Sequence, residues 1–290
     1  MMSQGMEDRI QRLSEHLMNL NEKIASGKVL NRPSDNPTAM VDSMTIKTSL
    51  SQIEQYQEGI QTGVSWLNLR ESALTNIEEV VARAIEIGTQ MGSDNQSADT
   101  RASSATEVGQ LLEEAIAQAN VELGDNYIFA GYRLKTTPFT ATVVGGIETA
   151  EYHGDTNDFQ LQIGKDETVV VGRNGQTTLM DSNLFTALGT LKKALEDNDG
   201  AAIRQQLDQL KSARDYLDNE IADTGAKGNR LDLKDAVWSS LTLDLRERLS
   251  DVEDADLTEM ITELKQKELA YQVALMSSVR LSELSILNYL

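Results

Sequence analysis

Apolar side chains near the start of the chain recur at alternating steps of four and three residues. This heptad spacing is typical of a helix that packs along one seam against other helices, as in a coiled coil or a helical bundle. Gly27 follows the stripe and is suited to ending the helix, because glycine readily adopts the left-handed conformation found at many helix ends. The stripe consists of Met6, Ile10, Leu13, Leu17, Leu20 and Ile24.

A second, longer stripe predicts a helix over about residues 37–91. Asn36 before Pro37 suits an N-cap followed by the first helical residue. Polar residues interrupt the stripe in places, as expected for a helix whose packing partners change along its length. Its apolar members are Ile46, Leu50, Ile53, Ile60, Val64, Leu67, Leu74, Val81 and Ile85. A third helix is predicted over about residues 100–123.

The sequence pattern changes after Gly124, where glycine, threonine and valine become frequent. Residues 127–130 and 167–171 predict strands. Gly145-Gly146 and Asn174-Gly175 predict hairpin turns, because such pairs tolerate the positive φ angles that tight hairpins require. We therefore expect a small β-rich insertion in the middle of the chain.

Helical periodicity resumes at residues 181–183, where Asp, Ser and Asn form a capping cluster. One stripe covers residues 184–195, and another covers residues 203–221. A final long helix is expected after Gly225 and Gly228. Its last residues, 281–290, are rich in leucine and too apolar to remain in water without a partner.

These patterns predict a mainly α fold: a long antiparallel helical bundle or coiled-coil rod built from both chain ends, with a small β-rich domain inserted in the middle. We expect terminal assembly helices at 1–30 and 271–290, a helical rod domain at 31–125 and 181–270, and the β-rich domain at 126–180. The central stripes fit the core of a single chain. For the terminal segments we favour subunit contact over core packing, and the predicted interface residues are Met6, Ile10, Leu13, Leu17, Leu20, Ile24, Tyr271, Leu275, Leu281, Leu284, Leu287 and Leu290.

Composition argues against several classes of function. The 46 acidic and 26 basic side chains give a formal charge of −20, which disfavours binding to nucleic acid or to an anionic membrane. The chain has no cysteine, and its two histidines, His16 and His153, are far apart in sequence. Asp155 and Asp158 lie in an acidic turn that lacks the later Gly and Glu of a calcium-binding loop. We predict no catalytic residue, no metal site and no cofactor.

Several motifs resemble signatures of the flagellin family, and in particular of its hook-associated junction subunits. Residues 26–37 read SGKVLNRPSDNP, and residues 126–131 read NYIFAG. Residues 228–232, 252–256 and 286–290 resemble the C-terminal helical region of the same family. The motif positions are Gly27, Asn31, Pro33, Ser34, Asp35, Pro37, Tyr127, Phe129 and Gly131.

The resemblance implies a structural subunit of the bacterial flagellum that joins the hook to the filament through its terminal helices. It implies self-assembly with neighbouring subunits and contact with hook-associated protein 1, with flagellin and with a flagellar export chaperone. It also implies an extracellular location, reached through type III export without a cleaved signal. Family members usually begin with a few more residues, so we expect that a short segment is missing before Met1.

Two alternatives remain open at this stage. The first is a filament-forming flagellin, which the motif at 126–131 and the proline-bearing loop at 31–37 disfavour. The second is an enzyme with a site in the β-rich insertion, which no catalytic constellation supports.

Overall fold

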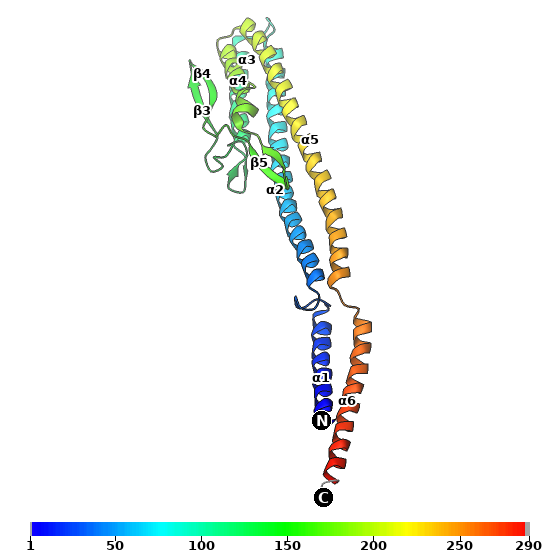
Figure 1. Ribbon diagram of the computed structural model, residues 1–290. Coiled ribbons are helices and arrows are strands. Elements are labelled where there is room, and N and C mark those ends of the chain that lie inside the picture. Colours follow the sequence, from blue (N-terminus) through cyan, green and yellow to red (C-terminus); the bar gives the residue numbers. More distant parts are fainter. Residues whose placement is uncertain (1, 288–290) are drawn as a thin grey trace. The chain divides into compact units, whose positions relative to one another are not determined.

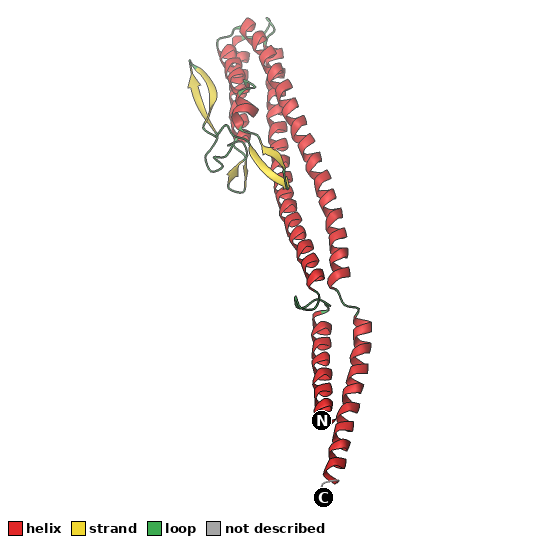
Figure 2. Ribbon diagram, viewed as in Figure 1, coloured by secondary structure: helices red, strands yellow, loops and turns green. Residues whose placement is uncertain are grey.

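The computed structural model describes residues 2–287, and it confirms a mainly α fold with short antiparallel strands inserted in the middle of the chain (Figures 1 and 2). The chain divides into two compact units. Unit one contains the two ends of the chain, up to Ile53 and from Ser239. Unit two contains everything between Glu54 and Trp238.

In its described part, unit one consists of helical segments and the connections between them. Its helices are α1 (Met2–Ser26), the first part of α2 (Pro37–Met91), the last part of α5 (Gly200–Glu253) and α6 (Leu257–Leu287). Figure 1 shows α1 and α6 side by side, and the two helices are in contact. Gly27 ends α1 with a φ of +69°, as the sequence predicted.

The predicted start of α2 is also confirmed. Pro37 is its first residue, and the Asn36 side-chain oxygen accepts a hydrogen bond from the Ala39 backbone N–H at 3.1 Å. This bond satisfies one of the amide groups that a helix start leaves without a partner.

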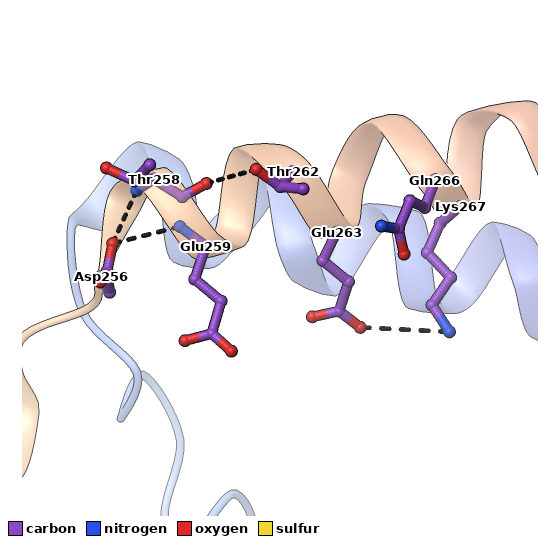
Figure 3. Close-up of a pocket in the computed structure, with 7 residues that line it drawn as sticks. All are labelled: Asp256, Thr258, Glu259, Thr262, Glu263, Gln266 and Lys267. Carbon is purple, nitrogen blue, oxygen red and sulfur yellow. Dashed lines mark hydrogen bonds and ion pairs between the residues drawn. The ribbon is translucent and has the colours of Figure 1, made fainter.

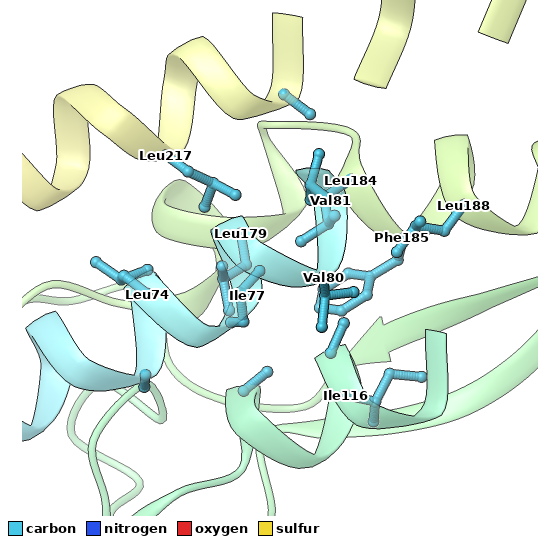
Figure 4. Packing of buried hydrophobic residues seen from close by; sticks show 14 of the residues in the cluster. Leu74, Ile77, Val80, Val81, Ile116, Leu179, Leu184, Phe185, Leu188 and Leu217 are labelled. Carbon is cyan, nitrogen blue, oxygen red and sulfur yellow. The ribbon is translucent and has the colours of Figure 1, made fainter. Parts of the chain in front are cut away.

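Unit two is organised around α2, α3 (Ala98–Ala119), α4 (Leu184–Glu196) and the first part of α5. The α2 and α5 helices run antiparallel, since Arg70 pairs with Glu220 and Glu78 pairs with Arg214. Aliphatic side chains and a few aromatic ones fill the space between these elements, and Figure 4 shows part of this cluster. The labelled members of this core are Leu74, Ile77, Val80, Val81, Ile116, Leu179, Leu184, Phe185, Leu188 and Leu217. Full burial of such a side chain contributes about 1.5–3 kcal/mol, so this cluster dominates the stability of unit two.

The strands of unit two form separate antiparallel pairs. They are β1 (Glu122–Leu123) with β2 (Asn126–Tyr127), β3 (Phe139–Val144) with β4 (Ile147–Tyr152), and β5 (Phe159–Gly164) with β6 (Glu167–Gly172). The predicted turn at Gly145-Gly146 joins β3 to β4, and both residues have positive φ, at +60° and +80°. The predicted strand at residues 167–171 is confirmed as β6.

Two strand and turn predictions were wrong. The strand predicted at residues 127–130 ends at Tyr127, because Ile128 and Phe129 turn into the core instead of continuing a ladder. Asn174-Gly175 does not form a hairpin turn but leads into a short π-helix, η1 (Gln176–Met180). The Asn174 amide group donates to the Thr156 carbonyl and the Asp158 carboxylate, which holds this segment in a different path.

The predicted interruption near Gly225 and Gly228 was also wrong. Helix α5 passes through both residues and ends at Glu253. A glycine inside a helix costs about 1 kcal/mol relative to alanine, which the packing of neighbouring buried residues such as Leu217 and Leu231 offsets. The break that the sequence did not predict lies between Glu253 and Leu257, where α5 gives way to α6.

Candidate assembly surface

The predicted interface residues of α1 lie along one side of that helix. Leu20 is buried, and Ile10, Leu13, Leu17 and Ile24 are half-buried. A mostly apolar groove runs between α1 and α6, and its lining residues are Arg9, Leu13, Gln266, Leu269, Ala270, Val273 and Ala274. The heptad stripe of α1 therefore meets α6 within the same chain, and a groove remains beside that contact.

The predicted interface residues at the other end of the chain divide into two groups. Tyr271 is half-buried, and Leu275 is 40% exposed. The side chains of Met6, Leu281, Leu284 and Leu287, and the whole of Leu290, lie outside the described part of the structure. Their proposed role therefore rests on the sequence pattern alone.

Helix α6 leaves much of its apolar surface uncovered. None of its side chains from Leu257 to Arg280, the part that the structure describes, is buried. Large apolar side chains of α6 that are exposed include Leu257, Ile261, Leu269, Val273, Leu275, Met276 and Val279. Exposed apolar side chains in this number on one helix are typical of a surface that contacts another protein.

The first turns of α6 carry a shallow polar depression (Figure 3). The Asp256 carboxylate caps the helix by accepting hydrogen bonds from the Thr258 and Glu259 amides, at 2.9 and 3.1 Å. Glu263 and Lys267 form an ion pair one turn apart. These polar groups pair along their own helix and do not converge on a common point, so the depression offers no arrangement for acid–base catalysis.

No group of three His, Asp or Glu side chains could hold a metal ion in the part of the chain that the structure describes. His16 is exposed on α1, whereas His153 forms a 2.8 Å hydrogen bond with Thr140. Asp155 instead accepts hydrogen bonds from the Asn157 backbone and side chain, in a local turn.

The loop that carries the first family motif is held by one carboxylate. Asp35 accepts hydrogen bonds from the backbone N–H groups of Arg32 and Asn31, at 2.9 and 3.1 Å. These bonds lower the pKa of Asp35 below its usual value. Pro33 and Ser34 are exposed at the tip of the loop. The motif therefore encodes a defined turn between α1 and α2.

The same turn is joined to the break between α5 and α6. The backbone N–H of Val29 donates to the Glu253 carbonyl at 2.7 Å, and that of Ala255 donates to the Gly27 carbonyl at 3.0 Å. The Glu253 carboxylate accepts hydrogen bonds from Lys28 at 2.8 Å, and from Lys47 and Ser43. Burial alone would raise its pKa, but these bonds lower the pKa of Glu253 to about 2. Nothing in the local sequence around Glu253 indicated this cluster.

Residues of the second family motif make several of the contacts that hold the β-rich region together. Phe129 is fully buried, and its carbonyl accepts hydrogen bonds from the Tyr152 hydroxyl at 2.9 Å and the Gly175 N–H at 2.8 Å. Burial raises the pKa of Tyr152 to about 12. Gly131 has a φ of +65°, and a side chain there would collide with the Asp155 carbonyl. The Tyr127 hydroxyl accepts a hydrogen bond from Thr137 at 3.1 Å.

No helix in the described part of the chain combines the length and the apolar character needed to cross a membrane.

Comparison with known proteins agrees with the motifs. The bacterial flagellin N-terminal helical region matches residues 1–133. Flagellar hook-associated protein 3 of Salmonella typhimurium is 26% identical over 283 residues, which cover 89% of this chain and 87% of that protein. The flagellar filament 30.7 kDa core protein of Treponema maltophilum is 23% identical over 252 residues, which cover 87% of this chain and 83% of that protein.

A solved structure supports the same fold. The structure of a flagellar hook-associated protein from Vibrio parahaemolyticus matches with a TM-score of 0.68 and 19% identity, covering 76% of this chain and 100% of that chain. At this identity the likeness concerns the fold. Together, these matches confirm the resemblance to the flagellin family and to hook-associated protein 3 within it.

Proposed function

We propose that this chain, a relative of flagellar hook-associated protein 3, is the structural subunit that joins hook to filament in a bacterial flagellum. The observation that carries the proposal is the uncovered apolar surface of α6, which has no buried side chain in its described part. A helix of this kind gains stability when neighbouring helices cover it. The Salmonella typhimurium protein matches the sequence over 89% of this chain, and the solved Vibrio parahaemolyticus structure shares the fold over 76% of it.

The terminal segments are the proposed contact region. Residues 1–30 and 271–290 act as assembly helices, residues 31–125 and 181–270 as the helical body, and residues 126–180 as the inserted β-rich domain. Subunit contacts are made by the α1 stripe from Met6 to Ile24 and by the α6 positions from Tyr271 to Leu290. The exposed side chains of Leu269 and Val273 extend this surface along the groove beside α1.

The proposed partners are neighbouring copies of this chain, hook-associated protein 1 and flagellin, with a flagellar export chaperone before assembly. The subunit works outside the cell and reaches that place through the flagellar export apparatus without a cleaved signal. The formal charge of −20 fits a chain that stays monomeric before assembly, because like-charged subunits repel each other. We propose no enzymatic role.

A substitution pair on α6 tests the contact region. Val273→Glu places a charge on the exposed apolar face, whereas Gln272→Glu places the same charge at a neighbouring exposed residue. We expect both monomers to keep their helical circular dichroism, because neither site is buried. Only V273E should fail to join the hook tip. Normal joining by V273E would contradict the proposal.

A filament-forming flagellin is the second candidate, and the match to a filament core protein supports it. Deletion of the gene in its own organism separates the two. Loss of a junction subunit should release flagellin monomers into the medium, because flagellin is still exported but has no platform to polymerise on. Loss of the filament subunit itself would leave none to release.

A further inference from the structure

The two helical paths of unit one, α1 to α2 and α5 to α6, are each interrupted once, and the two interruptions lie side by side. Helix α1 ends at Ser26 and α2 begins at Pro37, while α5 ends at Glu253 and α6 begins at Leu257. Lys28 and Asp254 pair as an isolated antiparallel bridge between these two interruptions. The backbone bonds from Val29 to Glu253 and from Ala255 to Gly27 flank that bridge.

The side chain of Glu253 connects this bridge to a third element. Its carboxylate is 4% exposed, and it bonds Lys28 from the first interruption and Ser43 and Lys47 from α2. Those bonds cross 225, 210 and 206 residues of sequence, respectively. A buried carboxylate with cationic partners is stable only while the partners stay in place, because an unpaired buried charge is costly.

The two terminal helices bury few of their own side chains. Leu20 is the one buried side chain among those described on α1, and the described part of α6 has none. In proteins most of the stability of a helix comes from the packing of an apolar face rather than from intrinsic helix propensity. Whether α1 and α6 stay ordered therefore depends strongly on the contacts at residues 27–29 and 253–255, where these helices join the rest of the chain.

We propose that Glu253 holds together a clamp that consists of residues 27–29 and 253–255 with Ser43 and Lys47. Because of this clamp, α1 and α6 dock and open together as one module. Release of the Glu253 carboxylate frees the ends of both helices together, because the same carboxylate and the same pair of backbone bonds hold both. The clamp belongs to the single chain and does not depend on the function proposed above.

Hydrogen exchange of the full chain tests the clamp with a matched pair of variants. Glu253→Gln keeps the shape of the side chain and removes its charge, and Glu247→Gln removes the same charge from an exposed position of α5. We expect E253Q to speed exchange roughly tenfold or more in both residues 7–26 and residues 257–280, since loss of a buried charge partner favours local opening. E247Q should exchange like the unmodified chain.

A second variant tests whether Lys28 acts through the same carboxylate. Lys28→Met should speed exchange in both segments by less than E253Q, because Ser43 and Lys47 still bond Glu253. Adding K28M to E253Q should then change little further. Faster exchange in only one of the two segments, or in neither, would overturn the proposal. So would an equal increase in residues 73–91 of unit two, because E253Q would then unfold the chain globally.

Discussion

The Arg70 guanidinium on α2 donates to the Glu220 carboxylate on α5 at 2.6 Å, and both side chains are removed from solvent. Arg173, which follows β6, pairs with the other oxygen of the same carboxylate. Burial is the main reason that the pKa of Arg70 is lowered from its usual value, and the charge of Glu220 opposes that change. Glu220 therefore joins α2, α5 and the β-rich region at one point.

Glu220→Gln should be among the most destabilising single substitutions in unit two. It leaves the Arg70 cation buried without its counter-charge, and breaking a buried pair in this way costs about 3–5 kcal/mol. Denaturant unfolding measures the loss, with Asp218→Asn at an exposed site on the same helix as the control. A loss below about 1 kcal/mol would mean that the pair contributes little beyond a surface ion pair.

Two glycines of unit two should respond in opposite ways to alanine. A side chain on Gly189 of α4 would collide with the Glu148 carbonyl of β4, whereas Gly225 of α5 faces open space. Gly225→Ala should raise the stability by about 0.5–1 kcal/mol, because alanine loses less conformational freedom in a helix. Gly189→Ala should lower it, because β4 must move away from α4. Thermal unfolding of the two variants under one condition measures both signs, and equal shifts would contradict the packing.

The helix boundaries of unit one show what the sequence could and could not predict. Gly27 and Asn36-Pro37 act through local backbone preferences, so the end of α1 and the start of α2 were predictable. The break after Glu253 depends on Lys28 and Lys47, which are more than 200 residues away in the sequence. The partners of Glu253 leave no local signal, whereas residues 256–259 contain a local capping pattern for the start of α6, with Asp256 as the cap.

The β-rich insertion also combines features that the sequence could predict with features that it could not. The turn at Gly145-Gly146 follows from residue type, because both positions require positive φ. The apolar run after Tyr127 has the composition of a strand, yet Phe129 is fully buried in the core of unit two and its carbonyl bonds Tyr152. Tertiary burial overrides strand propensity there. Periodicity left open whether the apolar stripes of the two chain ends pair with each other or with neighbouring subunits, and in the structure α1 contacts α6 of the same chain.

Acid should destabilise unit one through Glu253. Its pKa is about 2 in the folded chain, below the ordinary glutamate value, so the stabilisation is complete above about pH 4.5 and is lost as the pH falls toward 2. This difference in pKa corresponds to roughly 3 kcal/mol of stability. Lys28, Lys47 and Asp254 are the other charged groups at this site, and the hydrogen bond to Glu253 raises the pKa of Lys28.

Unfolding of the unmodified chain and of E253Q should therefore be compared at several pH values between 2 and 7. The gap in stability between the two should be widest near neutral pH and should close on acidification. This difference isolates the contribution of Glu253 from that of the other carboxylates of the chain. A gap that stays constant with pH would show that the charge of Glu253 is not what stabilises the clamp.

The last prediction concerns how the β5–β6 hairpin is held on unit two. Trp238 donates from its indole nitrogen to the Ile163 carbonyl at 2.9 Å and stacks on Tyr56 with ring centroids 5.5 Å apart. Glu167 at the hairpin turn pairs with Arg230 at 2.8 Å and with Lys234 at 2.6 Å. Glu167 is 36% exposed, so water screens these ion pairs, whereas Trp238 combines apolar contact with a hydrogen bond.

Trp238→Ala should therefore loosen the hairpin more than Glu167→Gln does. We expect E167Q to cost little stability, as is usual for solvent-exposed ion pairs, and W238A to cost clearly more. Hydrogen exchange of residues 159–172 reports the loosening directly, and residues 105–119 of α3 serve as an internal reference within unit two. Added salt should weaken the hairpin in W238A more than in the unmodified chain, because the ion pairs of Glu167 then carry a larger share of the attachment. Greater loosening by E167Q than by W238A would contradict this prediction and would mean that ion pairs are the main attachment of the hairpin.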